Sequence, residues 1–458
     1  MRPLAAFLLV LASALAAFGL VACGDDREPA SPPEVGMRER DVGSTLPVSP
    51  ATNEDAVADS VTVFYATDRA RFAPDLGWYG RRFLPAGIAL VLGLAFARRM
   101  RRMLRPEYAW RARVVRWIAL LAAAALSVHG GVRGLRMAKT SARLAVQYGD
   151  GRLEIASRPG LPVETGICQV SIPPSHVVGE VERPSLWKGD LYEDPRRHMI
   201  VHGVRSLEEE PWFFALRDVV AGSDAQDVFV FVHGYNVSFE EAVLRTAQIA
   251  YDLKFRGAPI CWSWPSQGGL AEYTVDEANV RWATAHLEKF LLALRDRSGA
   301  KHIHLIAHSM GNRALTETLQ RLSARVTDGV PIFDQVVLAA PDVDADTFRD
   351  EIAPALLPTS ARVTLYASSH DVALQASSRV HGYARAGEAG DGLVVVKGMD
   401  TVDVSEVSGG HSYIGNSGRV LDDLGAMLLR HAPREGRPDA VLRPLRGLHY
   451  WLLRTLGR

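Results

Sequence analysis

The feature that most restricts the fold of this chain is a serine placed between a strand-like and a helix-like segment. The run 303–307 is apolar and of strand length, and 313–322 has helical spacing. Ser309 lies between them, with Ala307 and Gly311 two residues to either side. Small residues at these positions let strand and helix approach across a sharp turn that exposes the hydroxyl and puts the helix N-terminus behind it. We therefore expect Ser309 to be a nucleophile.

Strand-like and helix-like segments alternate along the chain. Strand-like runs lie at 61–66, 228–232, 259–263, 303–307, 336–340 and 363–367, with a candidate at 393–396, and helical spacing at 239–255, 275–294, 313–322 and 420–429. This alternation is typical of an α/β fold with a mostly parallel, doubly wound sheet. Ligands of such sheets bind at the carboxyl ends of the strands, where Ser309 falls.

A serine hydroxyl needs a histidine to take its proton and a carboxylate to orient that histidine. In folds with this serine turn, the acid and then the histidine follow the serine along the chain. Asp371 follows the strand at 363–367 and is the favoured acid, while Asp342 follows the preceding strand and is its rival. His411, in a Gly-Gly-His-Ser-Tyr loop, is the favoured base. The other downstream candidates are His381 and His431.

The negative oxygen that forms during acyl transfer needs hydrogen-bond donors aimed at it. The amide of Met310, directly after the nucleophile, is one expected donor. The second is the amide of Gly234 or Tyr235, in the loop that follows the first core strand, and the glycine permits a tight path there. The side chain of His308 adjoins the serine in sequence and is expected to point away from it.

Several motifs occur together in this chain. They are Phe231-Val-His-Gly-Tyr-Asn236, Trp264-Pro-Ser266, Ala307-His-Ser-Met-Gly-Asn312, Ala340-Pro-Asp342 and Gly410-His-Ser-Tyr413. The set resembles a bacterial α/β-hydrolase family of undefined physiological function, whose members also tend to carry a Tyr-Ala-Thr-Asp-Arg segment, here Tyr65–Arg69. The resemblance covers about residues 61–70 and 165–430. It implies an α/β-hydrolase fold with a triad of Ser309, Asp371 and His411.

The chain begins with the features of a bacterial export signal. Arg2 supplies positive charge, residues 4–17 are almost purely apolar, and Leu20-Val-Ala-Cys23 resembles the end of a lipoprotein signal, in which the cysteine is diacylated. We predict a signal peptide at 1–22, lipid on Cys23, and a flexible tether over 23–60, which is rich in Asp, Glu, Pro, Ser and Gly. The alternative is an uncleaved anchor in which Cys23 is incidental.

Two apolar runs, Phe83–Ala97 and Trp117–Val132, flank a strongly basic stretch. Residues 98–116 contain eight arginines against the single acid Glu107. Each run is shorter than the ~20 residues of a typical spanning helix, but flanking arginines can reach the interface. By the positive-inside rule we predict a transmembrane hairpin over 83–132 with a cytoplasmic loop, which puts the later residues on the periplasmic side of the cell membrane. The alternative is a buried hairpin in a soluble domain.

The predicted hydrolase domain comprises 61–82 and 136–432, and a basic amphipathic tail follows at 433–458. From residue 430 onward the chain has seven arginines against Glu435 and Asp439, and apolar residues recur at helical spacing. The pattern predicts a helix that lies either on the membrane surface or against the hydrolase domain.

Composition argues against several functions. With 52 basic and 52 acidic residues the chain is not expected to bind nucleic acid in general. Three cysteines without a CxxC pair cannot build a disulfide scaffold. Cys168 and Cys261 are expected to be buried thiols, with a bond between them left open. Asp342, Asp344 and Asp346 have calcium-loop spacing but lack the later glycine and glutamate, so no metal is predicted, nor any organic cofactor.

The sequence therefore predicts a membrane-anchored serine hydrolase, esterase-like or lipase-like, that cleaves an ester, thioester or related acyl bond through an acyl-enzyme. Membrane attachment favours a lipid or lipid-linked acyl compound as substrate. Two alternatives remain open. One is a non-catalytic binding or assembly module built on a hydrolase scaffold. The other is an acyltransferase that passes the acyl group to an alcohol or amine.

Overall fold

The computed structural model describes residues 59–72, 146–155, 160–185, 190, 192–267, 272–326, 329–437 and 440–455. The predicted signal peptide, Cys23, the tether up to residue 58 and the predicted hairpin at 83–132 lie outside these residues. Within the described part of the chain, no helix has the length and apolarity needed to cross a membrane.

The described strands form a large sheet and a small one. They are β1 Asp59–Thr67, β2 Arg69–Arg71, β3 Tyr148–Arg152, β4 Glu164–Ile172, β5 Ile200–Leu207, β6 Asp227–Val232, β7 Ala258–Ser263, β8 His302–His308, β9 Phe333–Ala339, β10 Ser360–Ala367, β11 Asp400–Asp403, β12 Ala440–Leu445 and β13 Leu448–Leu453. The large sheet has the order β12-β13-β11-β10-β9-β8-β6-β7-β1-β4-β5, and β2 pairs with β3. Neighbours from β13 to β1 are parallel, and antiparallel strands flank them at both edges. The predicted mostly parallel sheet is confirmed.

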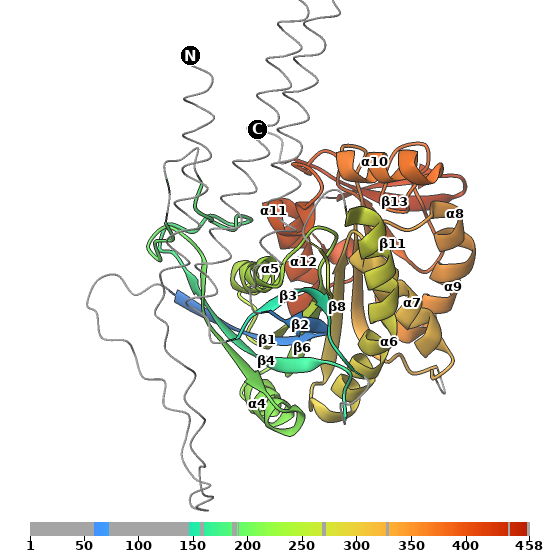
Figure 1. Cartoon of the computed structure of the whole chain (residues 1–458). Helices are drawn as coiled ribbons and strands as arrows, with labels where there is room; N and C mark the ends of the chain where they lie inside the picture. The colour runs from blue at the N-terminus through green and yellow to red at the C-terminus, as the bar shows by residue number, and fades with distance from the viewer. Residues whose placement is uncertain are drawn as a thin grey trace, which may run out of the picture. The chain divides into compact units, whose positions relative to one another are not determined.

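Helices cover both faces of this sheet (Figure 1). They are α4 Glu209–Ala221, α5 Phe239–Asp252, α6 Tyr273–Arg297, α7 Gly311–Ser323, α8 Ala345–Thr347, α9 Ala353–Leu356, α10 Val372–His381, α11 Tyr413–Asn416 and α12 Gly418–Arg430. Residues of α4, α6, α7 and α9 share one hydrophobic cluster with the strands, and residues of α5, α11 and α12 share another. Local sequence fixes the start of α5, where Ser238 and Glu241 form a reciprocal capping box.

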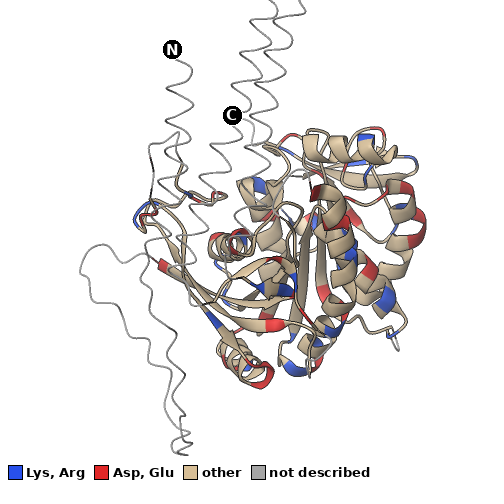
Figure 2. Ribbon diagram, in the orientation of Figure 1, with Lys and Arg blue, Asp and Glu red and all other residues tan. Residues whose placement is uncertain are grey.

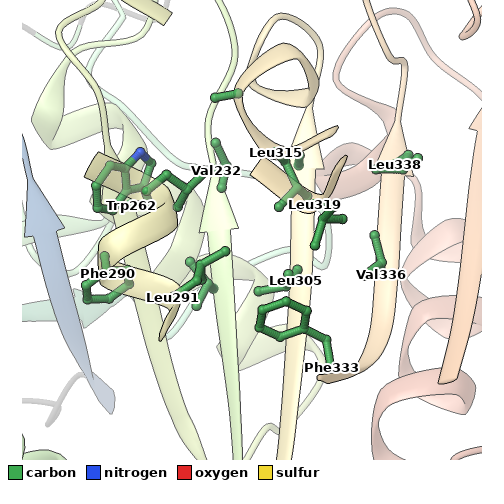
Figure 3. Close-up of a cluster of buried hydrophobic side chains, with 14 of the residues drawn as sticks. Val232, Trp262, Phe290, Leu291, Leu305, Leu315, Leu319, Phe333, Val336 and Leu338 are labelled. Atoms are coloured by element: carbon green, nitrogen blue, oxygen red, sulfur yellow. The ribbon is translucent and has the colours of Figure 1, made fainter. Parts of the chain in front are cut away.

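The central strands are buried on both faces, which explains their continuous apolar sequence. Every residue of β6 is buried. Figure 3 shows side chains of β6, β7, β8 and β9 packed against residues of α6 and α7, among them Val232, Trp262, Phe290, Leu305, Leu315 and Val336. Charged residues of both signs lie mainly on the helices and loops, and the central strands carry few of them (Figure 2). Cys168 and Cys261 are buried free thiols, as predicted.

The chain order around β6 creates the place where a site can form. From β6 the chain passes to its neighbour β7, and α6 then leads to β8 on the other side of β6. β6 and β8 are parallel and in register, with Val232 opposite Ala307. The loops after these two strands therefore leave the same edge of the sheet side by side, and this is where ligands bind in doubly wound sheets.

The long predicted insertion leaves and re-enters the fold at one point. β2 and β3 are antiparallel partners that lie on either side of it in sequence. Beyond them, the amide of Phe72 donates to the carbonyl of Gln147 at 2.8 Å. The described residues on either side of the stretch 73–145 are thus adjacent, and the predicted hairpin falls within that stretch.

The prediction of a helix at the C-terminus is wrong. Strands β12 and β13 form an antiparallel hairpin that extends the large sheet. Its two-residue turn, Arg446-Gly447, has positive φ at both positions (50° and 80°), the geometry that joins two strands tightly. Pro444 also disfavours a helix there, whereas an edge strand such as β12 tolerates it.

Two arginines of the basic tail are buried rather than turned toward a membrane. Arg434 and Arg437 are 2% and 5% exposed. Arg434 Nη1 donates to Asp423 Oδ1 at 3.0 Å, and Arg437 lies 3.6 Å from the same atom. The tail is therefore anchored to α12 through charge pairing that the one-dimensional pattern does not show.

The candidate strand at 393–396 is also wrong, because those residues form no strand and the next one is β11. The short β11 contains Asp400, Thr401 and Asp403 and carries little apolar signal. Its place in the sheet comes from pairing with β10 and β13 rather than from its own composition.

Candidate active site

Ser309 occupies the sharp turn between β8 and α7. Its φ of +53° is uncommon for a residue with a side chain and costs energy that the surrounding fold must supply. The amide of Ser309 donates to Ala339 O at 3.0 Å, and its carbonyl accepts from Asn312 N at 3.0 Å. A serine held in this strained conformation, with the first turn of a helix behind it, is the arrangement of the nucleophile turn in hydrolytic enzymes.

The glycine two residues after Ser309 is required by close packing. A Cβ on Gly311 would lie 2.3 Å from His233 O and 2.8 Å from Val232 O. Such distances are far inside van der Waals contact, so any side chain here would push α7 away from the end of β6. Ala307, on the other side, is fully buried in β8.

His411 and Asp371 form a hydrogen-bonded pair. The Nδ1 of His411 lies 2.7 Å from Asp371 Oδ2 and 2.9 Å from Oδ1. Asp371 is fully buried, follows β10, and caps α10 by accepting from the amides of Ala373 and Leu374. A proton on Nδ1 that is donated to a carboxylate leaves Nε2 of the imidazole free to act as a base.

His308 joins this pair to the nucleophile turn, a role that the sequence did not predict. Its Nε2 donates to the carbonyl of His411 at 3.0 Å, and the two rings are 4.6 Å apart. Burial, followed by the neighbouring His411 ring, lowers the pKa of His308 to about 3. His308 is therefore neutral at ordinary pH and fixes the loop of His411 beside the residue that precedes Ser309.

The rival acid, Asp342, is occupied elsewhere. It accepts from Tyr273 Oη and Ser377 Oγ, both at 2.6 Å, and pairs with Arg313 at 3.1 Å and Arg385 at 3.4 Å. Burial alone would raise the pKa of this carboxyl, but Arg313 and the two hydroxyls outweigh burial and lower it. Asp342 thus belongs to a structural ion-pair network, and the structure brings Asp371, not Asp342, to His411.

The other two downstream histidines also have other partners. His381, the last residue of α10, contacts Ser377 O at 2.8 Å and Glu277 Oε1 at 2.8 Å. His431 follows α12 and lies 3.6 Å from Asp334. In the Asp342–Asp346 segment, Asp344 caps α8 and Asp346 pairs with Arg349. These carboxylates serve helix capping and ion pairs rather than a calcium loop.

The expected donors for an oxyanion lie on both sides of Ser309. Met310 is the N-cap of α7, and the first amides of a helix have no partner within it. The loop after β6 runs directly against the nucleophile, since a Cβ on Gly234 would lie 2.8 Å from Ser309 Cβ. Tyr235 packs against Tyr273 with ring centroids 5.2 Å apart. Gly234 is therefore the residue that allows this backbone to approach the serine.

A buried arginine far away in sequence supports this loop. Arg69 is 1% exposed, and its guanidinium makes five polar contacts. They are Ser263 Oγ at 2.8 Å, Gly149 O at 3.0 Å, Ser266 O at 3.1 Å, Val237 O at 2.7 Å and His233 Nε2 at 3.3 Å. Burial lowers the pKa of Arg69 to about 10, so it remains charged at neutral pH. The sequence showed this residue only as part of a family motif, without a role.

His233 transmits that support to the loop. Its Nδ1 donates to Gly234 O at 2.8 Å, and its carbonyl accepts from Trp264 Nε1 at 2.8 Å. The imidazole stacks on the Trp264 ring, with centroids 5.0 Å apart. Burial, and then the charge of Arg69, holds the pKa of His233 well below its ordinary value. The ring is therefore neutral, and Nε2 can accept from Arg69.

Residues 212–421 match the model of a family described as alpha/beta hydrolase of unknown function (DUF900). The match begins in α4, ends in α12 and contains Ser309, Asp371 and His411. Over these residues, somewhat less than half of the chain, the protein is similar to the α/β hydrolases of this family, and its mostly parallel sheet with helices on both faces is the corresponding fold. No curated protein matches the chain.

Solved structures share only a distant likeness. An uncharacterized protein from Bacillus cereus is 10% identical, with a TM-score of 0.29 over 45% of this chain and 60% of that one. The alpha/beta hydrolase domain-containing protein 10 from mouse is 13% identical, with a TM-score of 0.26 over 44% and 88%. A carboxylesterase from Bacillus subtilis is 11% identical, with a TM-score of 0.25 over 50% and 100%. Likeness at this level says nothing about the reaction.

Proposed function

We propose that this protein is a serine hydrolase that cleaves an ester, thioester or related acyl bond. The observation that carries the proposal is the His411–Asp371 pair, held beside the strained turn of Ser309 by the contact between His308 and His411. A buried carboxylate that orients a histidine at the carboxyl edge of the sheet is the equipment a serine needs to attack a carbonyl.

The reaction runs in two halves. Ser309 Oγ attacks the acyl carbon while Nε2 of His411 takes its proton, and Asp371 stabilises the resulting imidazolium. The amides of Met310 and of Gly234 or Tyr235 bind the negative oxygen. The imidazolium then gives its proton to the leaving alcohol or thiol. In the second half, water gives a proton to His411, attacks the acyl-serine, and releases the acid while the proton returns to Ser309.

Labelling with a fluorophosphonate probe tests this proposal, using full-length protein solubilised in detergent. We expect strong labelling of wild type, none of Ser309→Ala, and greatly slowed labelling of Asp371→Ala and His411→Ala. Asp342→Asn and His381→Ala are matched controls, since they remove a carboxylate and an imidazole that have other partners, and they are expected to label like wild type. Thermal melts establish that each variant is folded. Folded wild type that does not label would favour the non-catalytic scaffold.

We also propose that the protein is attached to the cell membrane, with the hydrolase domain on the periplasmic side. The support comes from the sequence: the lipoprotein-like ending at Cys23 and the two apolar runs around an arginine-rich stretch. The described residues that flank the stretch 73–145 lie next to each other, which suits a hairpin that leaves and rejoins the domain. Incorporation of labelled palmitate in wild type but not in Cys23→Ala would support lipidation, and equal incorporation would exclude Cys23 as its site.

The substrate class follows from this location. A site tethered to a membrane meets lipids and lipid-linked acyl compounds at high local concentration, so we propose these as substrates. Rates on p-nitrophenyl esters from two to sixteen carbons, followed by phospholipid vesicles, test the preference. A rate that rises with chain length supports a lipid-like substrate, and a preference for the shortest esters contradicts it. Product analysis with an added alcohol separates hydrolysis from acyl transfer.

A further inference from the structure

Histidines and carboxylates gather at the opposite edge of the sheet, where the parallel strands begin. Asp227 and His302 are the first residues of β6 and β8 and lie opposite each other in register. His431 comes from the end of α12, which packs over the same strands. One potential ligand atom from each of these three residues lies within 4.8 Å of the other two.

A fourth side chain lies beside this group of three and has no hydrogen-bond partner among the described residues. His304 is 0% exposed, and neither of its ring nitrogens has a hydrogen-bond partner in the described part of the chain. Its Nε2 faces Asp227 Oδ2 at 4.0 Å, too far for a hydrogen bond, and its ring lies 5.8 Å from that of His431. Oδ1 of Asp227 is also buried and unpartnered within that part. Buried polar groups are nearly always satisfied, so these atoms call for a ligand.

A second carboxylate orients the histidines from outside the group. Asp334 Oδ2 lies 2.5 Å from Nδ1 of His302, and its Oδ1 lies 3.6 Å from Nδ1 of His431. A carboxylate on one imidazole nitrogen is the usual companion of a histidine that binds metal through the other. This arrangement leaves Nε2 of His302 as its ligand atom.

We propose that Asp227, His302 and His431, with His304 as the fourth ligand, bind a divalent transition-metal ion such as Zn²⁺. Imidazole and carboxylate donors suit Zn²⁺, whereas Ca²⁺ and Mg²⁺ take oxygen ligands. Tetrahedral zinc bonds of about 2.0–2.2 Å put ligand atoms roughly 3.4 Å apart, so the three would draw together by about 1.4 Å at most. The side chains of His302 and His431 are 35% and 37% exposed, which gives the ion a path in.

The site would be structural, since it lies at the edge of the sheet opposite Ser309. A metal there would tie the end of α12 to the starts of β6 and β8. It would also hold the buried His304 and Asp227 in a satisfied state. The proposal is independent of the hydrolase function and stands or fails separately from it.

Zinc binding by the full-length, untagged protein tests the proposal. After removal of metals with EDTA, wild type in equilibrium dialysis is expected to take up one Zn²⁺ per chain and to melt at a higher temperature with zinc than without. His302→Ala and His431→Asn are expected to weaken binding by about 100-fold or more, and Asp334→Asn by about 10- to 100-fold. Asparagine is chosen at position 431 because it tolerates the positive φ there.

His449→Ala is the matched control, because this exposed histidine lies on β13, outside the cluster. It is expected to bind zinc as tightly as wild type. Co²⁺ in place of zinc should give the visible absorption of a tetrahedral site in wild type and in the control, and lose it in His302→Ala. Wild type that binds no zinc, or that binds it no more tightly than His302→Ala and His431→Asn, would overturn the proposal.

Discussion

The two edges of the parallel sheet carry similar residues arranged for different chemistry. At the carboxyl edge, Nδ1 of His411 lies 2.7 Å from Asp371, and at the opposite edge, Nδ1 of His302 lies 2.5 Å from Asp334. Only the carboxyl edge has Ser309 on a strained turn with a helix N-terminus behind it. The opposite edge has further histidines and a carboxylate instead.

The difference shows that a histidine–aspartate pair does not by itself define a catalytic site. The direction of the strands determines which edge can hold a catalytic site. Every parallel strand ends at the same edge, and the loops that follow can bring a nucleophile, a base and oxyanion donors together. Where strands begin, side chains of adjacent strands converge without such loops. Histidines that meet there without a nucleophile are suited to binding a ligand such as a metal ion rather than to catalysis.

The largest expected difference between the two edges comes from replacing one aspartate at each of them with asparagine and comparing kcat. Asp371→Asn keeps a side chain that can cap α10 but no longer fixes the tautomer of His411, so kcat on an activated ester should fall by about 10³- to 10⁴-fold. Asp334→Asn should leave kcat unchanged. Steady-state kinetics on both variants make the comparison, and an equal loss in the two would show that the edges are not functionally distinct.

The second-largest loss of reactivity is expected when a methyl group is added beside the nucleophile. Gly234→Ala puts a Cβ 2.8 Å from Ser309 Cβ, which must displace the loop or the serine, so fluorophosphonate labelling should slow by about 100-fold, the loss expected for a misplaced oxyanion donor. Gly203→Ala is the control, because a Cβ there meets nothing within 4 Å. Labelling of Gly234→Ala at the wild-type rate would remove this loop from the site.

Arg69→Lys tests the support beneath the loop. Lysine keeps the charge but cannot reproduce the forked contacts to Val237, Ser263, Ser266, Gly149 and His233. Because Arg69 acts by positioning the loop, Arg69→Lys should lower kcat by about 10-fold with little change in KM. The pH dependence of kcat should stay the same, because His411 is untouched. Arg71→Lys, half-exposed on β2 and paired with Glu164, is the comparison variant and should keep kcat. A change in KM alone would place Arg69 in substrate binding instead.

The smallest effect concerns acid and the buried His308. Its pKa of about 3 in the fold lies below the ~6.5 of an unfolded histidine. Between these values the unfolded state binds more protons, so stability is full above pH ~6.5 and falls as pH drops. At pH 5 the stability lost through His308, relative to neutral pH, is about 2 kcal/mol. The free energy of unfolding, measured in urea, should therefore fall less for His308→Gln than for wild type between pH 7 and pH 5. Equal losses in the two proteins would contradict a buried, neutral His308.

The sequence allowed prediction of the parts that depend on local pattern. The strand-serine-helix segment, the strands β6 to β10 and the serine turn follow from apolar runs and small residues at fixed spacing. The sequence favoured Asp371 as the acid but kept Asp342 as a rival, because the choice depends on which carboxylate the loop of His411 reaches. Asp342 is taken by Arg313 and Arg385, and these contacts become visible only in the fold.

Long-range contacts explain what sequence reasoning missed. Arg69 bonds with residues up to 197 positions away, so no local pattern could reveal its role. The cluster of His302, His304 and His431 draws on strand starts and a helix end that are distant in the chain. The C-terminal pattern left open whether the tail lies on a membrane surface or against the hydrolase domain, and Arg434 and Arg437 pair with Asp423 inside the fold.

The most direct test of the central claim is to trap the acyl-enzyme. Wild type mixed with a p-nitrophenyl ester, quenched in acid within milliseconds and digested, should carry the acyl group on the peptide that contains Ser309, in proportion to a burst of p-nitrophenol. Ser309→Ala should give neither the adduct nor the burst. Folded wild type that releases p-nitrophenol without an adduct on Ser309, or that carries the acyl group on another residue, would contradict the account.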